Sequence, residues 1–204
     1  MARQQTVHIV DDDAAVRKAL VMLMQSDELQ VESYASAEEF IKNVTAEDKG
    51  CILLDVRMPG MSGLELQQLL REQRIGMPVI IMTGFADVAM AVEAMKAGAS
   101  DFIEKPFDND YLLKQVKTCL QKSEKIQSAQ DQQQAADDKI ARLTRREREV
   151  MDMLVAGHQN RVIAEKLGIS PRTVEIHRAR VMEKLETHSL SGVVRIALSV
   201  ADTA

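Results

Sequence analysis

Residues 8–13 read HIVDDD, an apolar stretch that runs directly into three consecutive aspartates. The β-branched residues favour a strand, so the aspartates stand where that strand ends. Adjacent carboxylates repel one another, and a turn or a helix start needs only one of them. Local chain geometry therefore does not explain why three aspartates occur together. The explanation depends on which other residues lie near them in the fold.

The first 122 residues alternate short apolar runs with amphipathic helical stretches. The apolar runs predict strands at 6–10, 31–34, 51–54, 78–82 and 101–103. The stretches between them predict helices near 14–26, 36–44, 62–73, 86–97 and 108–121. Five such βα units with short connections predict an α/β fold, in which a five-stranded parallel, doubly wound sheet carries helices on both faces.

The composition of the chain changes after residue 122. Residues 123–139, SEKIQSAQDQQQAADDK, are polar, contain no Gly or Pro, and favour a helical, semi-rigid linker as much as a flexible one. From Leu143 the pattern is helical throughout, which leaves residues 140–204 for a small all-α domain. Residues 1–122 carry 13 Lys and Arg against 19 Asp and Glu, whereas residues 139–204 carry 12 against 8. A contact with nucleic acid would therefore lie in the C-terminal part.

Composition also argues against several classes of protein. With 46% hydrophobic residues, the chain can build packed cores. It contains no apolar run near the roughly 18 residues of a membrane span, and its start, MARQQTVHIV, lacks the regions of a signal peptide. We therefore expect a cytoplasmic protein with no membrane partner. Cys51 and Cys119 have no ligand-like spacing, and we expect reduced, partly buried thiols.

Side chains with useful chemistry follow four of the five predicted strands. They are Asp11, Asp12, Asp55, Thr83, Lys105 and Pro106. The carboxyl ends of parallel strands share one edge of a sheet, so these side chains should converge. Three carboxylates in one cleft raise one another's pKa, and a hard divalent cation such as Mg2+ removes that cost. Each residue alone has an ordinary role as a helix cap, turn residue or edge charge. Their joint occurrence instead predicts a Mg2+ site, with Asp13 serving only as an acid in the first turn of a helix.

Four motifs carry a family resemblance. IVDDD, LLDVRMPGMSG, IIMTG and FIEKPF, in this order, resemble the receiver domain of two-component response regulators over about residues 4–122. The resemblance implies a flavodoxin-like fold with Asp55 as the phosphoacceptor. It implies that Mg2+ is held by Asp11, Asp12, Asp55 and the backbone carbonyl of Arg57. It also implies phosphoryl-contact and switch roles for Thr83, Phe102, Lys105 and Pro106, with Pro106 after a cis peptide bond.

The same resemblance implies that phosphorylation promotes dimerisation through the fourth helix and fifth strand. The candidate contacts are Val92, Met95 and Lys96. The alternative is that this Val and Met stripe packs onto the sheet. Arg57 and Phe85 flank the expected site and are candidates for setting the lifetime of the phosphoryl group.

Residues 160–181, NRVIAEKLGISPRTVEIHRARV, have the pattern of a helix-turn-helix. Gly168 permits the positive φ of a tight turn, Ser170 is a candidate N-cap, and Pro171 fits the first helical position. The second helix of such a unit enters the major groove of DNA. An α-hairpin in an ordinary bundle is the alternative. The positive charge of this part favours DNA, as do helical stretches on either side that complete a four-helix unit.

LTRREREV, NRVIAEKLGIS and PRTVEIHRARVMEKL resemble the LuxR-type output domain over residues 143–198. The resemblance implies that Glu175, Ile176 and Ala179 face base edges. It places Arg172, Thr173, His177 and Arg180 near phosphates, and Lys184 adds to the positive charge of the same helix. The alternative for His177 is a structural histidine bonded to neighbouring backbone. The stretch KLETHSL departs from the more basic endings usual after this helix, which weakens any phosphate contact there.

Receiver, Gln-rich linker and output domain together resemble the FixJ-like subgroup of response regulators. The implied function is a transcription regulator, an activator by resemblance, that is not a dedicated enzyme. A histidine kinase would phosphorylate Asp55, and the protein would then form a homodimer, bind promoter DNA and act with RNA polymerase.

Two other functions compete with this one. Asp11 and Asp13 form a DxD pattern typical of haloacid-dehalogenase-type phosphohydrolases, but Ala15 replaces the usual Thr or Val, and no cap-sized insertion is visible. The second alternative is a phosphorylation-independent DNA-binding regulator whose receiver serves only dimerisation. The occupied receiver positions argue against it.

Overall fold

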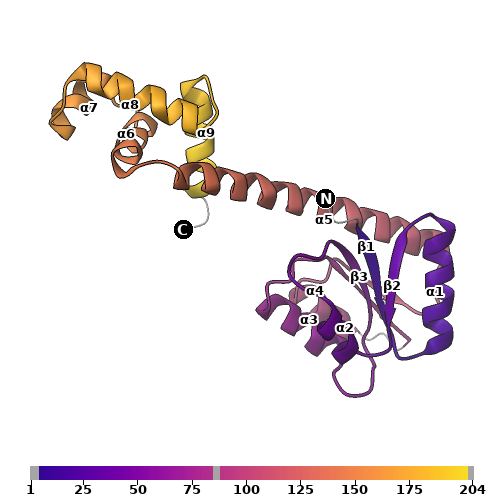
Figure 1. Cartoon of the computed structure of the whole chain (residues 1–204). Coiled ribbons are helices and arrows are strands. Elements are labelled where there is room, and N and C mark those ends of the chain that lie inside the picture. Colours follow the sequence, from indigo (N-terminus) through magenta and orange to yellow (C-terminus); the bar gives the residue numbers. More distant parts are fainter. Residues whose placement is uncertain (1–4, 85–87, 202–204) are drawn as a thin grey trace. The chain divides into compact units, whose positions relative to one another are not determined.

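The computed structural model describes residues 5–84 and 88–201 and divides into two compact units, residues 1–127 and 128–204 (Figure 1). The division falls inside the expected linker. Each unit has its own hydrophobic core. Among the described residues, no helix is both long enough and apolar enough to cross a membrane.

The N-terminal unit is built on a parallel sheet, which in the described residues has five strands. They are β1 (Thr6–Val10), β2 (Gln30–Tyr34), β3 (Gly50–Asp55), β4 (Val79–Thr83) and β5 (Asp101–Glu104), in the order β2-β1-β3-β4-β5. This confirms the predicted fold class. After β2 the chain crosses back to the other side of β1, so the strand order reverses between β1 and β3. Ligand sites of such sheets lie at the carboxyl ends of the strands beside this reversal.

Helices cover both faces of the sheet. They are α1 (Ala14–Ser26), α2 (Ala37–Asn43), α3 (Gly63–Glu72), α4 (Val88–Lys96) and α5 (Asn109–Ala141). Ile52 and Leu54 of β3 pack with side chains of α2, α3 and α4, whereas Cys51 and Leu53 pack with side chains of α1 and α5. Alternate β3 residues thus enter opposite cores, which explains why this strand reads as an unbroken apolar run.

Local capping starts several of these helices as the sequence predicts. Ser36 caps α2, and Ser62 caps α3 in a reciprocal capping box with Glu65. Asp108 accepts a hydrogen bond from Tyr111 N at the start of α5. Asp13 differs from expectation, because it is the N-cap of α1 rather than an acid within its first turn. Helix α5 also continues well beyond the predicted end at 121 and includes all of residues 123–139.

The C-terminal unit is helical, as predicted. Beyond the end of α5 it contains α6 (Arg145–Val155), α7 (Asn160–Leu167), α8 (Pro171–Lys184) and α9 (Leu190–Ala201). Gly168 ends α7 in the left-handed conformation at φ 64°, and Ser170 accepts a hydrogen bond from Thr173 N to start α8. Val174 packs against Val150 and Ile163, so the α7–turn–α8 pair shares a core with α6. This is the geometry of a helix-turn-helix supported by a preceding helix.

Candidate phosphoacceptor pocket and nucleic-acid interface

One ammonium group bridges two buried carboxylates at the carboxyl ends of the strands. Lys105 follows β5, and its Nζ lies 2.6 Å from Asp11 Oδ2 and 2.5 Å from Asp55 Oδ1. Asp11 follows β1 and Asp55 ends β3, the two strands between which the strand order reverses. Asp11 is 1% exposed and Asp55 is 6% exposed. The fold thus brings Lys105 to two carboxylates that lie 94 and 50 positions before it in the sequence.

The remaining carboxylate oxygens are also hydrogen bonded. Asp11 Oδ1 accepts from Asp13 N at 2.9 Å, and Asp55 Oδ2 accepts from Arg57 N at 2.7 Å. Arg17 Nη1 donates to the Asp11 carbonyl at 2.7 Å and holds the start of α1 against the end of β1. Each carboxylate is therefore fixed through both oxygens, which orients the pocket in advance of any ligand.

Burial and charge act against each other on the pKa values of this pocket. Burial raises the pKa of Asp55 and outweighs the opposing effect of Lys105 and the Arg57 amide, while the Asp11 charge raises that pKa further. Burial lowers the pKa of Lys105, but its bonds to Asp11 and Asp55 raise it above the ordinary lysine value. Lys105 therefore stays protonated and compensates the two acids.

The other expected receiver residues lie on β4 and β5 or directly after them. Thr83 ends β4 and is 1% exposed, and its carbonyl accepts from Lys105 N at 2.8 Å. The Lys105–Pro106 peptide bond is cis, which confirms that expectation. Phe102 lies on β5 and is partly buried against the core. Phe85 lies outside the described residues.

The expected metal ligands come together only in part. Asp12 is exposed, unlike Asp11. Among the residues that the structure describes, no three His, Cys, Asp or Glu side chains are grouped so as to hold a metal ion. The donor chemistry nevertheless fits Mg2+, which prefers one or two carboxylates and completes its octahedron with waters. Lys105 already supplies positive charge between Asp11 and Asp55, and a divalent cation would add to that compensation of the two acids.

Helix α8 presents most of the expected DNA-contacting residues to solvent. Arg172, Glu175, Ile176, Ala179 and Arg180 are exposed, with Ile176 at 48%. Thr173 and His177 are half-buried. The buried Nδ1 of His177 makes no hydrogen bond, so a backbone-bonded structural role is not seen at this atom.

Lys184 has a structural partner that sequence reasoning missed. Its Nζ lies 2.7 Å from Glu147 Oε2 and also donates to the Arg142 carbonyl at 3.2 Å. Burial raises the pKa of Glu147, but bonds from Lys184 and from Thr144 at the start of α6 outweigh it and lower this pKa to about 2. The sequence contains a signal for the position of Glu147. Thr-Arg-Arg-Glu at 144–147 is a capping-box pattern, which directs the glutamate side chain back to the start of α6.

Known protein families match both units. The response regulator receiver domain family matches residues 7–117, and the luxR family of bacterial regulatory proteins matches residues 141–197. The chain is 47% identical to the transcriptional regulatory protein FixJ of Azorhizobium caulinodans over 198 residues, which cover 97% of this chain and 94% of that protein. This chain belongs to the two-component response regulators. It carries a LuxR-type DNA-binding output domain and resembles FixJ along its full length.

Other relatives agree with this assignment. The response regulator is 45% identical to FixJ of Rhizobium meliloti over 197 residues, 95% of each chain. It is 37% identical to the response regulator protein TodT of Pseudomonas putida over 201 residues, 98% of this chain and 88% of that protein. Among solved structures, response regulator StyR matches with a TM-score of 0.89 and 38% identity, covering 96% of this chain and 99% of that one. Full-length FixJ from B. japonicum matches with a TM-score of 0.58 and 39% identity, covering 98% of each.

Helix α4 of this response regulator carries an exposed apolar stripe. Val92 is 45% exposed and Met95 is 48% exposed, and Val88, one turn earlier, is 82% exposed. Lys96 is also exposed, whereas Ala94 on the opposite face is buried. The stripe therefore does not pack onto the sheet, and the packing alternative for these residues is wrong.

Proposed function

We propose that this response regulator is a transcription activator controlled by phosphorylation of Asp55. The observation that carries the proposal is the fixed Asp55 carboxylate, which lies between Lys105 Nζ and Arg57 N at the point where the strand order reverses. A nucleophile held between a lysine ammonium group and a backbone donor is suited to accept a phosphoryl group whose charge the same groups then compensate.

In the proposed reaction, an Asp55 oxygen attacks the phosphorus of a phosphohistidine on the partner kinase. The new P–O bond forms as the P–N bond breaks, and the departing imidazole takes a proton from solvent. Lys105 Nζ leaves Asp55 and pairs with a phosphoryl oxygen, to which the Thr83 hydroxyl also donates. Mg2+, held by Asp11, Asp12, Asp55 and the Arg57 carbonyl, would neutralise the charge that spreads over the transferring group.

The proposed output of this event is a homodimer. Movement of Thr83 toward the phosphoryl group lets Phe102 rotate inward and biases the surface formed by α4 and β5. Val92, Met95 and Lys96 are the proposed contacts, supported by the exposure of the first two. The chain is assigned a receiver at 1–122, a linker at 123–139 and an output domain at 140–204.

The proposed DNA contacts lie on α8. Glu175, Ile176 and Ala179 would meet base edges, and the phosphate contacts would come from Arg172, Thr173, His177 and Arg180. Lys184 is assigned a smaller part, because its ammonium group already pairs with the buried Glu147. A dimer would set two output domains on paired half-sites and bring RNA polymerase to the promoter.

The phosphohydrolase alternative fits the pocket less well. Asp11, its required nucleophile, is buried and hydrogen bonded through both oxygens as Asp55 is, so these features do not separate the two candidates. Asp13, its required acid, accepts hydrogen bonds from Ala15 N and Val16 N as a helix cap. The acid that this reaction requires is therefore already engaged as the cap of α1.

The deciding experiment is intact mass after incubation with acetyl phosphate, with and without Mg2+, followed by peptide mapping. We expect one phosphoryl adduct on Asp55 that requires Mg2+, is absent in Asp55→Asn and persists in Asp110→Asn, a change at an exposed aspartate of α5. An adduct on Asp11 would favour the phosphohydrolase. No adduct from either acetyl phosphate or a phosphorylated kinase would favour a receiver that serves only dimerisation.

A further inference from the structure

Helix α7, the first helix of the helix-turn-helix, depends on its neighbours for stability. It has eight residues, Asn160–Leu167, and an isolated helix of that length is marginal in water. Within the described part of the chain, its N-cap Gln159 makes no side-chain hydrogen bond to the helix start. Ile163 and Ala164 bury one face of α7 in the core shared with α6 and α8. Further support for the ends of α7 has to come from other helices.

An arginine of α6 binds the last carbonyl of α7. Arg146 donates through Nη2 to the Leu167 carbonyl and through Nη1 to Glu149 Oε2 at 2.7 Å. The last carbonyls of a helix have no partner within it, and the C-terminal end of the helix dipole favours a cation. The bond to Glu149 restrains the guanidinium group, whose other nitrogen then meets this carbonyl. Arg146 thus closes the open end of α7 from a different helix.

The bound carbonyl lies directly before the turn into α8. Gly168 follows it at φ 64°, and Ser170 is the N-cap of α8. Ile169 N donates back to the Ala164 carbonyl at 3.0 Å, and the Ile169 side chain packs against the core that α6, α7 and α8 share. The hydrogen bond from α6 to Leu167 therefore fixes the start of the turn relative to α6, and with it the angle between α7 and α8.

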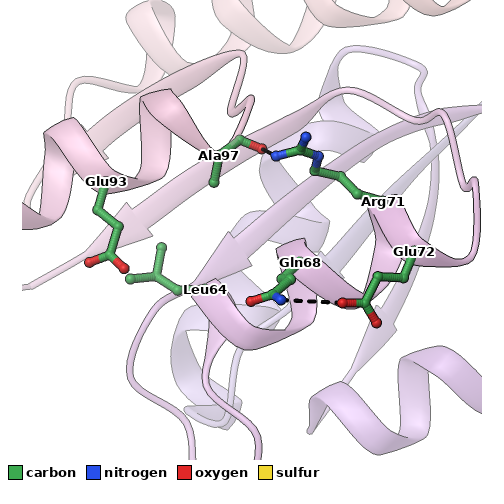
Figure 2. A pocket seen from close by; sticks show the side chains of 6 residues that line it. All are labelled: Leu64, Gln68, Arg71, Glu72, Glu93 and Ala97. Carbon is green, nitrogen blue, oxygen red and sulfur yellow. Dashed lines mark hydrogen bonds between the residues drawn. The ribbon is translucent and has the colours of Figure 1, made fainter.

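The N-terminal unit contains a longer contact of the same kind. Arg71 of α3 donates through Nη1 to the carbonyl of Ala97, directly after α4, at 3.4 Å (Figure 2). Arg71 is exposed and lines a surface cavity of about 500 Å³, where water competes for its donors. Glu72, the next residue, is bonded to Gln68 (Figure 2). Arg146 differs because a carboxylate restrains it and because the helix end that it binds leads into α8.

Arg146 is also more enclosed than the arginine beside it. The Arg146 side chain is 35% exposed, whereas that of Arg145 is 94% exposed. Both bind Glu149, Arg145 through Nε at 3.2 Å, but only Arg146 also bonds to α7 among the residues that the structure describes. Two nitrogens of Arg146 are therefore engaged inside the unit, which argues against a phosphate contact through them.

We propose that Arg146 is a positioning residue for DNA recognition, which acts through the Leu167 carbonyl and makes no contact with DNA. In a helix-turn-helix, the first helix crosses the DNA backbone while the second lies in the major groove. The angle between α7 and α8 thus decides whether both helices reach their places together. This inference rests on the proposed DNA contacts of α8.

The test compares the binding of the full-length protein, in acetyl phosphate and Mg2+, to two DNA duplexes at several salt concentrations. The first is the duplex that wild type enriches most from a random pool, and the second has its sequence scrambled. Base contacts need a fixed geometry, whereas attraction to phosphates is independent of sequence. The ratio of the two affinities therefore reports positioning. An unfolded fraction of protein lowers both affinities by the same factor and leaves this ratio unchanged.

We expect Arg146→Gln to lower the affinity ratio roughly tenfold, the cost of about one lost base contact, with the salt dependence of wild type. Arg145→Gln removes the same charge from the same helix and should keep the wild-type ratio. Arg146→Lys should lie between wild type and Arg146→Gln, because an ammonium group can still donate to the Leu167 carbonyl but lacks the planar fork that also binds Glu149.

An unchanged ratio in both Arg146 variants would overturn the inference. So would an equal fall in Arg145→Gln, which would trace the effect to lost charge. A salt dependence that drops by about one phosphate contact in Arg146→Gln would likewise overturn it, because Arg146 would then bind DNA directly. None of these results affects the proposed base contacts of α8. Wild type that enriched no sequence from the pool would overturn those contacts together with the inference.

Discussion

At the scale of single residues, the receiver pocket depends on one cation. Asp11 and Asp55 are buried carboxylates at the carboxyl ends of the adjacent strands β1 and β3, and Lys105, 20% exposed, lies between them. Two buried like charges destabilise a fold unless an opposite charge compensates them. Because these two carboxylates need positive charge beside them, the same pocket can bind both the Lys105 ammonium group and a divalent cation.

Replacement of Lys105 by Met should therefore destabilise the N-terminal unit and make its stability depend on Mg2+. We expect a loss of about 2–3 kcal/mol in the free energy of unfolding without metal, because two buried carboxylates lose their counter-charge. Mg2+ should recover part of this loss in Lys105→Met and much less in wild type. Urea denaturation with and without Mg2+ measures both, with Lys18→Met as the exposed-lysine control. Equal stability of wild type and Lys105→Met without metal would contradict the compensating role of Lys105.

At the scale of the element, helix α8 combines an exposed face, which carries the proposed DNA contacts, with an ion pair to the buried Glu147. Its exposed residues include Glu175 and Arg180, whereas Lys184 in its last turn pairs with Glu147 of α6. Arg178 Nη1 adds a bond to Asn160 Oδ1 of α7 at 3.4 Å. Lys184 and Arg178 thus bind other helices of the same unit, whereas Glu175 and Arg180 stay exposed. Mutations of the first two should therefore change stability, and mutations of the last two should change DNA binding.

Acid should unfold the C-terminal unit through Glu147. Its folded pKa of about 2 lies below the ordinary glutamate value of 4.5. The stabilisation is therefore complete above about pH 4.5 and is lost as the pH falls from there toward 2, at a cost on the order of 2 kcal/mol. Hydrogen exchange of α6 and α8 amides between pH 6 and pH 3 should show this loss in wild type but not in Glu147→Gln, which is already destabilised at pH 6. Glu183→Gln, a change at an exposed glutamate of α8, should keep the wild-type pH dependence.

Two changes on α8 should affect DNA binding differently. Arg180→Ala should weaken binding to every sequence and reduce the salt dependence by about one phosphate contact. Glu175→Ala should instead change the ranking of preferred sites, because a carboxylate in the major groove accepts from cytosine N4. Selection of binding sites from a random DNA pool, with affinities measured at several salt concentrations, separates the two effects. An unchanged ranking for Glu175→Ala would refute its place at a base edge.

At the scale of the whole molecule, the proposed phosphorylation acts by changing how two chains associate. The exposed stripe on α4 offers the surface, and Met95 lies within it. Met95→Asp should abolish dimerisation in acetyl phosphate and Mg2+ while leaving the Asp55 adduct intact, because a charge then replaces an apolar contact. Light scattering coupled to gel filtration measures the mass, and intact mass spectrometry measures the adduct. Met22→Asp, at an α1 methionine that is 62% exposed, should dimerise normally. Normal dimerisation of Met95→Asp would move the interface away from α4.

The sequence by itself was enough for features that depend on neighbours along the chain. The apolar runs that became β1, β3 and β4 are buried strands because both faces of the sheet are covered, and burial on both faces removes the need for polar residues. Gly168, Ser170 and Pro171 predicted the turn into α8 because capping and positive φ are requirements of single positions. Family motifs added the expected roles of the pocket residues.

Only the tertiary structure decided which charges meet. Lys105 lies between Asp11 and Asp55 although 94 and 50 positions separate them, and Lys184 pairs with Glu147 across 37 positions. Neither pairing follows from propensity or periodicity, since an ion pair depends on where two elements pack. The sequence predicted a helical linker at 123–139, but only the structure joined it to the preceding helix as the single α5, which ends at Ala141. Local patterns determine elements, whereas long-range packing determines the partners of each side chain.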